Sequence, residues 1–488
     1  MGEAASPRAD PHEWMRDVFL RLLGAVYLVA FLSFWVQAEG LVGTHGILPI
    51  RDLLLLARER LGPSRYWVLP TVFWLGDGDL ALHVVCASGA ALAMLALLGR
   101  ARPLVMLGLW GLYLSLTVAG EDFLSFQWDV LLLEAGLLAV PLAPRGLLRP
   151  QPGLPPLLVV WMYRWLLFRL MFGSGVVKLR SGDTAWRSLT ALQYHYETQP
   201  LPTWIGFYAH HLPTGVHTAC CAVMFLIELV LPWLIWFPGR WRRVPLVAFV
   251  GFQMLIAATG NYAFFNLLTI ALCVFLVDPG LLPRRWRPPA AAAPEAPATL
   301  FGPWPRALLA PLLAVLALVS VVQLSEATLG LGVAWPSPVV WLARAVSPLR
   351  SVNSYGLFAV MTTTRPEIVV EGSDDGQTWR AYEFRYKPGD LQRRPGFVAP
   401  HQPRLDWQMW FAALGGSCDE SPWLQGLFER LREGSPPVVG LLGSNPFPDR
   451  PPRYVRALLY DYRFADLATH RRTGEWWQRH LETGFCGP

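Results

Sequence analysis

Lys178 lies where an amine could act as a base inside an otherwise apolar stretch. The apolar run that begins at Trp161 breaks at the glycines of residues 173–175, and Lys178 follows in the sequence Gly-Val-Val-Lys-Leu. All of the 41 basic residues except Lys178 and Lys387 are arginine. Withdrawal from water lowers the pKa of a lysine, which is what a general base needs. The alternative is a lysine at the end of a membrane helix whose ammonium reaches the polar interface.

A polar and aromatic loop follows Lys178 and offers side chains that could face a client or a ligand. These candidates are Asp183, Trp186, Tyr194, His195, Tyr196 and Glu197. With His195, the histidines at 210, 211 and 217 have spacings that match no standard zinc site, so the sequence predicts no metal. It also contains no nucleotide-binding glycine motif, no nucleophile elbow and no zincin motif, and we expect no cofactor.

Charged residues also lie within apolar runs long enough to cross a membrane, where an unpaired charge is costly. They are Asp129, Glu134, Arg164, Arg169 and Glu228. Counted from the outer ends of two antiparallel helices, Asp129 and Arg169 are about six residues deep, and Glu134 and Arg164 about eleven, or ~17 Å. We therefore expect the pairs Asp129–Arg169 and Glu134–Arg164, with Glu228 at a similar depth. These pairs either hold the bundle together or line a cavity that handles a substrate or protons.

The composition is that of a polytopic membrane protein. Of the 488 residues 53% are hydrophobic and 16% are charged, whereas a soluble domain has about 25% charged residues. Runs of about 20 apolar residues predict about nine spans. They are 18–36, 80–98, 103–119, 123–142, 156–175, 215–237, 244–259, 262–277 and 306–324, with 66–75 as a re-entrant or interfacial segment. We expect the first run to remain as a span and not to be cleaved as a signal peptide.

Arginine-rich loops indicate the orientation of these spans. The arginines cluster in alternate loops and before the first span, at Arg8, Arg16, Arg100, Arg102, Arg145, Arg149, Arg240, Arg242, Arg243, Arg284, Arg285 and Arg287. Because cytoplasmic loops carry the excess of Lys and Arg, the N-terminus is expected inside, and residues 178–213 and 325–488 outside. The net charge of +6 is thus a topological signal, and we expect no nucleic-acid binding.

The chain divides into a membrane domain (1–287), a Pro/Ala linker (288–305), a last transmembrane helix (306–324) and an extracytoplasmic β-rich domain (325–488). In the last part, a turn at 373–376 between runs at 368–371 and 379–386 predicts a β-hairpin. Residues 454–464 predict a further strand, and 406–414 and 422–432 predict helices. The fold expected there is β-sandwich-like with helical insertions. Cys418 and Cys486 either form a disulfide in an oxidising compartment or remain free thiols.

Segments of both parts resemble the lipase maturation factors and their bacterial relatives. They include GLVGTHGILP (40–49), FLSFQWDVLLLEAGLLA (123–139), RWLLFRLMFGSGVVKL (164–179), NSYGLFAVMT (353–362) and PHQPRLDWQMWFAALG (400–415). The resemblance implies a helical membrane domain followed by a family domain on the lumenal or periplasmic side. The membrane part is also distantly similar to that of vitamin K-dependent γ-carboxylase, whose G-V-x-K-L motif is matched at residues 175–179 and implies a base at Lys178.

Three functional interpretations follow. The leading one is a membrane-embedded maturation factor, chaperone-like and not an enzyme, that assists the folding or assembly of a secreted lipase or a similar exported client. The second is a carboxylase-like membrane enzyme that uses Lys178 as a base on a quinone-type cofactor. The third is a lipid-binding or transport protein. The expected partners are the secreted client and membrane lipids, and the expected location is the bacterial inner membrane, or the endoplasmic reticulum membrane in a eukaryote.

Overall fold

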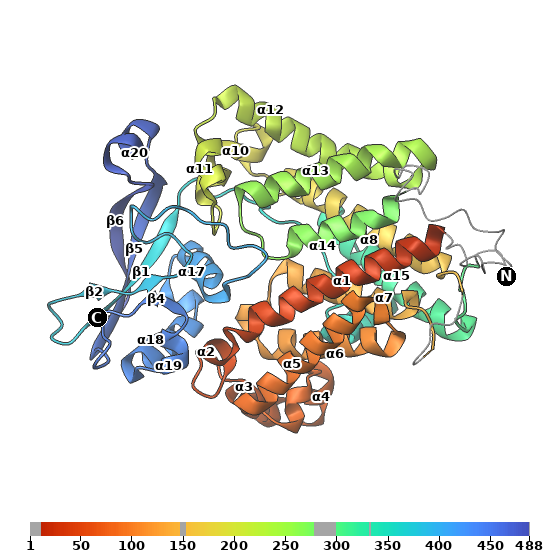
Figure 1. Ribbon diagram of the computed structural model, residues 1–488, viewed down its shortest axis with the longest axis horizontal. Helices are drawn as coiled ribbons and strands as arrows, with labels where there is room; N and C mark the ends of the chain where they lie inside the picture. Colours follow the sequence, from red (N-terminus) through yellow and green to blue (C-terminus); the bar gives the residue numbers. More distant parts are fainter. Residues whose placement is uncertain (1–10, 147–152, 278–298, 331–332, 488) are drawn as a thin grey trace, which may run out of the picture.

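The computed structural model describes residues 11–146, 153–277, 299–330 and 333–487. Long apolar helices fill one side of the molecule, and a twisted sheet with short helices lies on the other (Figure 1). Most of the expected linker 288–305 lies outside the described residues. The same is true of several arginines used for the orientation, namely Arg8, Arg149, Arg284, Arg285 and Arg287.

Within the described residues, six helical segments are long and apolar enough to cross a membrane, and the protein is an integral membrane protein. They are His12–Trp35, Asp79–Arg100, Leu157–Arg180, Thr214–Trp236, Gly239–Thr259 and Arg306–Leu329. Two further expected spans are present as the shorter apolar helices Pro103–Ala119 and Phe265–Leu276. The remaining one is α7 (Gln127–Leu142), whose 16 residues extend only about 24 Å, less than the hydrocarbon core of a bilayer. The expected nine spans are therefore not confirmed.

Short helices join these segments. The helices of the membrane part and its outer loops are α1 (Pro11–Trp35), α2 (Ala38–Val42), α3 (Ile50–Leu61), α4 (Arg65–Val68), α5 (Asp79–Leu95), α6 (Pro103–Ala119), α7 (Gln127–Leu142), α8 (Leu157–Arg180), α9 (Thr184–Arg187), α10 (Leu192–Thr198), α11 (Trp204–His210), α12 (Thr214–Phe225), α13 (Arg243–Thr259), α14 (Phe265–Leu272), α15 (Arg306–Leu329) and α16 (Ser337–Val346). α7 packs between α6 and α8, and most of its side chains are buried.

The span Thr214–Trp236 changes its helical geometry at Glu228. It begins as α12, continues as a π-helical turn at Leu226–Val230 and ends as a 3-10 segment at Leu231–Trp236. Pro232 has no amide hydrogen to donate, so the α-helical bonding pattern cannot continue through it. A π-helical turn inserts an extra residue and is found often at functional sites. The turn packs against α8, and Glu228 is buried there.

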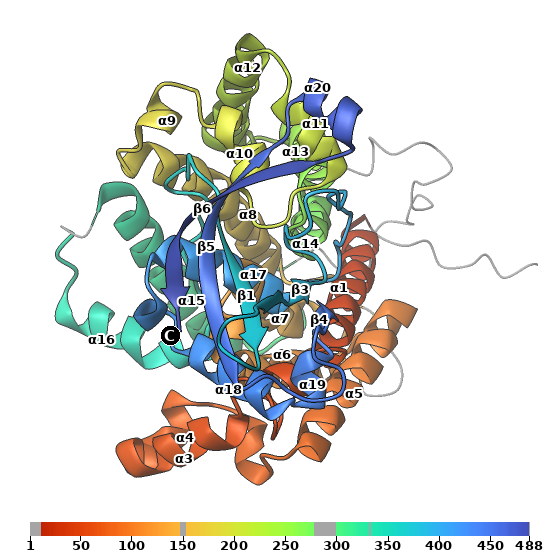
Figure 2. The ribbon, with the colours of Figure 1, turned by 90° about the vertical axis from the view of Figure 1, so that its left-hand side faces the viewer.

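The C-terminal part is built on a four-stranded antiparallel sheet in the order β2-β1-β5-β6 (Figure 2). The strands are β1 (Pro366–Ser373), β2 (Arg380–Ala381), β3 (Glu383–Phe384), β4 (Leu442–Ser444), β5 (Tyr454–Phe464) and β6 (Trp477–Cys486). The predicted strand at 454–464 is confirmed as β5. The predicted strand at 379–386 is split, because β2 pairs with β1 while β3 pairs with β4 in a separate two-stranded sheet.

Helices occupy the place of a sandwich's second large sheet. They are α17 (Arg404–Gly415), α18 (Trp423–Glu433), α19 (Pro436–Val439) and α20 (Leu467–Thr473). α17 packs on β1 and α18 on β5, with buried side chains such as Leu405, Met409 and Leu427 in the core. A disulfide joins Cys418 to Cys486 at the end of β6. A β-containing domain after the membrane helices is therefore confirmed, with helices rather than a full second sheet against it.

Candidate functional site

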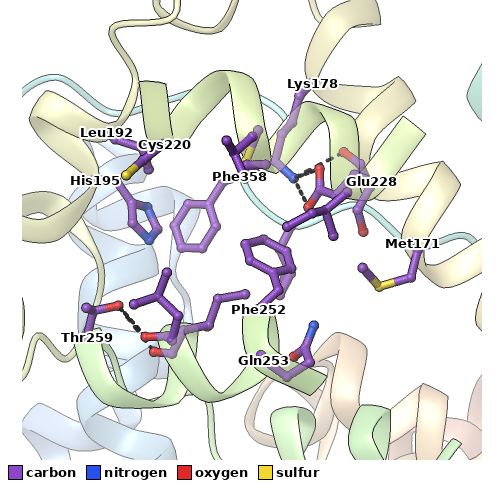
Figure 3. Close-up of a pocket in the computed structure, with 18 of the residues that line it drawn as sticks. Met171, Lys178, Leu192, His195, Cys220, Glu228, Phe252, Gln253, Thr259 and Phe358 are labelled. Atoms are coloured by element: carbon purple, nitrogen blue, oxygen red, sulfur yellow. Dashed lines mark hydrogen bonds and ion pairs between the residues drawn. The ribbon is translucent and has the colours of Figure 1, made fainter. Parts of the chain in front are cut away.

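A cavity of about 500 Å³ lies within the membrane part, lined by α8, α10, α12 with its π-helical turn, and α13 (Figure 3). Most of its lining is apolar. Its ionisable residues include Lys178 from α8, His195 from α10 and Glu228 from the π-helical turn. Residues from three separate stretches of the sequence thus come together at this one cavity.

Lys178 and Glu228 form a buried ion pair at the edge of the cavity. The lysine Nζ donates to the two carboxylate oxygens at 2.8 Å and 2.7 Å, and to the carbonyl oxygen of Ser174 at 3.2 Å. The two side chains are 7% and 6% exposed. Since an ammonium has three hydrogens, these bonds use all of them, and the geometry is that of a charged pair.

The glycine at position 175 permits this pairing. A Cβ built on Gly175 would lie 2.7 Å from Cδ2 of Leu229 and 3.0 Å from Cβ of Glu228. α8 and the π-helical turn are therefore too close together for a side chain at this position. Lys178 follows three residues later on the same face of the helix and reaches Glu228. The Gly-x-x-Lys spacing thus has a structural reason that is independent of any catalysis.

The ring of His195 also lines the cavity, and its tautomer follows from its neighbours. Its Nε2 lies 3.3 Å from the hydroxyl of Tyr262, which itself donates to Oε1 of Gln199 at 2.9 Å. The tyrosine hydrogen is thereby used, so Nε2 must carry the proton that is shared with Tyr262. Nδ1 is then a bare acceptor, and it is buried without a partner among the described residues. Burial, and then the charge of Lys178, lowers the pKa of His195 to about 4, so the ring is neutral at pH 7.

The other loop candidates contact the protein itself. Asp183 caps α9 and accepts a hydrogen bond from the amide of Met361 at 2.7 Å. Trp186 is buried, and its ring centroid is 5.4 Å from Nζ of Lys178. Glu197 accepts from the amide of Phe464 at 2.6 Å. Tyr194 packs against the small hydrophobic cluster that contains Trp186, and Tyr196 lines the cavity. The role of these side chains toward a client stays a prediction.

Asp129 does not pair with Arg169, so the first expected pair is wrong. Both of its carboxylate oxygens accept from Arg404, each at 2.8 Å, and the hydroxyl of Tyr113 donates to one of them. Arg404 and Asp129 are 1% and 0% exposed. The partner of Asp129 therefore comes from α17 in the C-terminal part and not from the neighbouring membrane helix.

Glu134 does not pair with Arg164, so the second expected pair is wrong as well. Glu134 accepts from Arg169, from the hydroxyl of Tyr355 at 2.6 Å and from the amide of Asn353 at 3.2 Å. Arg164 instead donates to the carbonyl oxygen of Phe275 at 3.0 Å. The expected pairs came from comparing depths along α7 and α8 alone. That comparison could not include Asn353 and Tyr355, which follow α15 in the chain and reach Glu134.

Comparison with known sequences identifies the family. The sequence model described as the lipase maturation factor transmembrane domain matches residues 14–284, and that of the lipase maturation factor C-terminal domain matches residues 351–486. The chain belongs to the lipase maturation factor family. Lipase maturation factor 2 of Homo sapiens is 38% identical over 96% of this chain and 82% of its own length. Lipase maturation factor 1 is 34% identical in Mus musculus, over 96% of this chain and 85% of the relative, and 34% in Bos taurus, over 98% and 89%. No solved structure matches.

The residues that join the two family domains were missed in the sequence. Arg404, Asn353 and Tyr355 all lie after the last span and bind carboxylates of α7. Gln402 also contacts the membrane part, because its backbone amide donates to the hydroxyl oxygen of Ser33 on α1 at 2.9 Å. A signal was present, because polar residues interrupt two segments used for the family resemblance, 353–362 and 400–415. Those segments gave no indication that their partners lie in the membrane part.

No group of three or more His, Cys, Asp or Glu side chains within the described ranges is arranged to hold a metal ion. In the loop, Nε2 of His210 lies 3.8 Å from Oε2 of Glu197. Burial, and then the neighbouring His211 and His217, lowers the pKa of His210 to about 4. The ring of His210 is therefore neutral at pH 7.

Proposed function

We propose that this protein is a maturation factor that assists the folding or assembly of a secreted lipase or a similar exported client. The observation that carries the proposal is the extent of the similarity. The similarity extends over both family domains. The alignments with relatives named lipase maturation factor 1 and 2 cover 96% of this chain. The chain matches the models of both family domains. A match to both supports a role that needs both domains and their junction.

The proposal places the C-terminal domain outside the cytoplasm. The arginines at the ends of the spans support a cytoplasmic N-terminus. The disulfide between Cys418 and Cys486 supports an oxidising compartment for the C-terminal domain, because disulfides persist there and are rare in the cytosol. The membrane is the inner membrane of a bacterium, or that of the endoplasmic reticulum in a eukaryotic host. A client emerging from the secretion machinery meets the domain on that side.

A groove at the junction of the two domains is where the client would bind. This aromatic groove, of about 560 Å³, is lined by Trp128, Val360, Trp407, Trp410, Phe411 and Leu414, among others. Val360 is 63% and Phe411 45% exposed. Exposed apolar surface of this kind marks interaction sites, and an incompletely folded lipase offers the apolar segments that would cover it.

Secretion of active lipase tests this function. Cells that lack their own family member would express a secreted lipase with this protein, with Phe411→Asp, or with Leu481→Asp as the matched control. Leu481 is 49% exposed but lies on β6, away from the groove. The proposal predicts that the wild type and Leu481→Asp raise the yield of active lipase and that Phe411→Asp does not. Equal yields with and without the wild-type protein in the membrane would contradict it, as would an equal rise of an unrelated secreted enzyme.

The cavity geometry disfavours the alternative of a quinone-dependent enzyme. A base at Lys178 needs a free lone pair, whereas its nitrogen donates to both carboxylate oxygens of Glu228 and to the carbonyl oxygen of Ser174. The bonded state of Lys178 therefore speaks against a base at this position, and we derive no reaction step from a quinone.

A further inference from the structure

The cavity beside Lys178 is built like a site for a hydrocarbon chain. Its walls are formed by side chains such as Leu170, Met171, Met224, Phe252, Ile256 and Phe265. Its volume of about 500 Å³ is within the range of about 300–1,000 Å³ that is typical of sites for small molecules. Figure 3 shows Phe358 and Phe252 between His195 on one side and the Lys178–Glu228 pair on the other, with Met171 beyond Glu228.

The cavity reaches the surface of the protein where that surface faces the membrane. Three of its lining residues are themselves well exposed, with Val223 at 52%, Val247 at 72% and Leu255 at 55%. They lie on the spans Thr214–Trp236 and Gly239–Thr259. Because both segments are apolar membrane helices, the molecules that meet this opening are lipids, and a chain can enter sideways from the bilayer.

The polar end of the cavity carries no net charge. Among the described residues that line it, the charged ones are Lys178 and Glu228, which neutralise each other at 2.7 Å. The ring of His195 is neutral because its pKa is lowered to about 4. A phosphate headgroup would find no unpaired cation here, and its burial without one is costly. The site therefore favours a lipid whose headgroup is uncharged.

His195, which lines the cavity, has one buried nitrogen that a ligand hydroxyl would satisfy. Nδ1 of His195 has no partner in the described part of the chain, and the tautomer set by Tyr262 and Gln199 leaves it without a hydrogen. A buried acceptor without a donor is destabilising, so a ligand with a hydroxyl group is favoured over one with carbonyl oxygens only. A glycerolipid with a free hydroxyl satisfies both requirements.

We propose that the cavity binds an uncharged, hydroxyl-bearing membrane lipid of the diacylglycerol class. Its acyl chain lies along the apolar wall formed by α8 and α13, and its hydroxyl donates to Nδ1 of His195. The Lys178–Glu228 pair borders the headgroup and excludes anionic lipids by its lack of net charge. The cavity shares Tyr262, Leu357 and Phe358 with the client groove, but lipid labelling and lipase secretion are separate measurements, so either proposal can fail without the other.

Photo-crosslinking in nanodiscs tests the site. The full-length protein would be labelled with a diazirine-bearing diacylglycerol, with the same probe acetylated on its hydroxyl, and with the phosphatidic acid of the same chains. The expected result is labelling of α8 and α13 by diacylglycerol, with about tenfold less labelling by the other two, which corresponds to about 1.4 kcal/mol. Equal labelling by phosphatidic acid would overturn the uncharged headgroup, and equal labelling by the acetylated probe would overturn the hydroxyl contact.

Two glycines provide a matched pair of variants. A Cβ at Gly251, which lines the cavity, or at Gly111, which lies on α6 away from it, would meet no atom within 4 Å. Gly251→Leu fills the cavity and is expected to reduce diacylglycerol labelling about tenfold, while Gly111→Leu leaves it unchanged. His195→Phe keeps a flat ring and should abolish the preference for the free hydroxyl. Unchanged labelling of Gly251→Leu, or no labelling of the folded wild type by any probe, would overturn the proposal.

Discussion

The carboxylates of α7 and the carboxylate of the π-helical turn are all buried, but they are used differently. Asp129 and Glu134 each receive hydrogen bonds from more than one donor, and these donors include residues of the C-terminal part. Glu228 receives its bonds from Lys178, within the membrane part, and borders a cavity. The first two charges hold the family's two domains together. The third forms one wall of a binding site.

The largest expected effect is on the junction between the domains. Asp129→Asn leaves Arg404 as a buried charge without its partner, and such a loss costs ~3–5 kcal/mol. Arg404→Gln should cost a similar amount, and the double variant less than the sum of the two. Thermal unfolding of the detergent-solubilised protein measures these differences.

The control for this cycle is the combination of Asp129→Asn with Arg169→Gln. Asp129 and Arg169 bond to different partners among the described residues, so their effects are expected to add within about 0.5 kcal/mol. Strong coupling of Asp129 to Arg169, with none to Arg404, would restore the pairing expected from the sequence and contradict the structure.

A smaller effect is expected at the segment that enters the bundle after α15. Tyr355→Phe removes one hydrogen bond to the Glu134 carboxylate, which is worth about 1.5–3 kcal/mol because the acceptor is charged. Asn353 and Arg169 still bind Glu134, so the protein should fold with a lower melting temperature. Limited proteolysis should then cleave near residues 353–362 faster than in the wild type. Cleavage at an unchanged rate would mean that this segment is held by other contacts.

Mild acid should loosen the junction between the domains. His401 bonds to Ser33 of α1 at 2.9 Å, and burial, followed by the charges of Arg404 and Arg385, lowers its pKa to about 4. The unfolded chain binds its proton near the ordinary histidine value of about 6.5. The stability from neutral His401 is therefore present above that value and is lost as the pH falls toward 4.

The pH dependence of the melting temperature checks this effect. His401→Gln keeps a hydrogen-bonding side chain that does not titrate, so the fall in melting temperature between pH 6.5 and pH 4 should become shallower. His195, whose pKa is also lowered to about 4, contributes in the same direction from the cavity. An identical acid profile in His401→Gln and the wild type would remove His401 from this explanation.

The local parts of the fold could be predicted from the sequence. The helix at Pro103–Ala119 and the strand at Tyr454–Phe464 have the expected bounds, because hydrophobic runs and alternation are local signals. The split of the strand at 379–386 could not be predicted, since β3 leaves the first sheet to pair with β4, more than 50 residues later, at Leu442–Ser444.

The site could be predicted only in its components. Lys178, His195 and Glu228 were all candidates, because a charge within a span or a lone lysine stands out against apolar neighbours. Their meeting at one cavity depends on the π-helical turn around Glu228, which has no recognisable sequence signal besides Pro232. The partner of Asp129 lies 275 residues away at Arg404, beyond the reach of any count along neighbouring helices.

Lys178→Arg gives the most direct test of a maturation factor against an enzyme. An arginine keeps the positive charge that Glu228 requires but cannot act as a base, because a guanidinium stays protonated. The measurement is the yield of active secreted lipase, at equal levels of folded membrane protein, with wild type, Lys178→Arg and Lys178→Ala. The maturation-factor account predicts that Lys178→Arg retains most of the yield and that Lys178→Ala, which leaves Glu228 unpaired, loses it. Loss of the yield in Lys178→Arg, with a normal melting temperature, would contradict the account and favour proton transfer at Lys178.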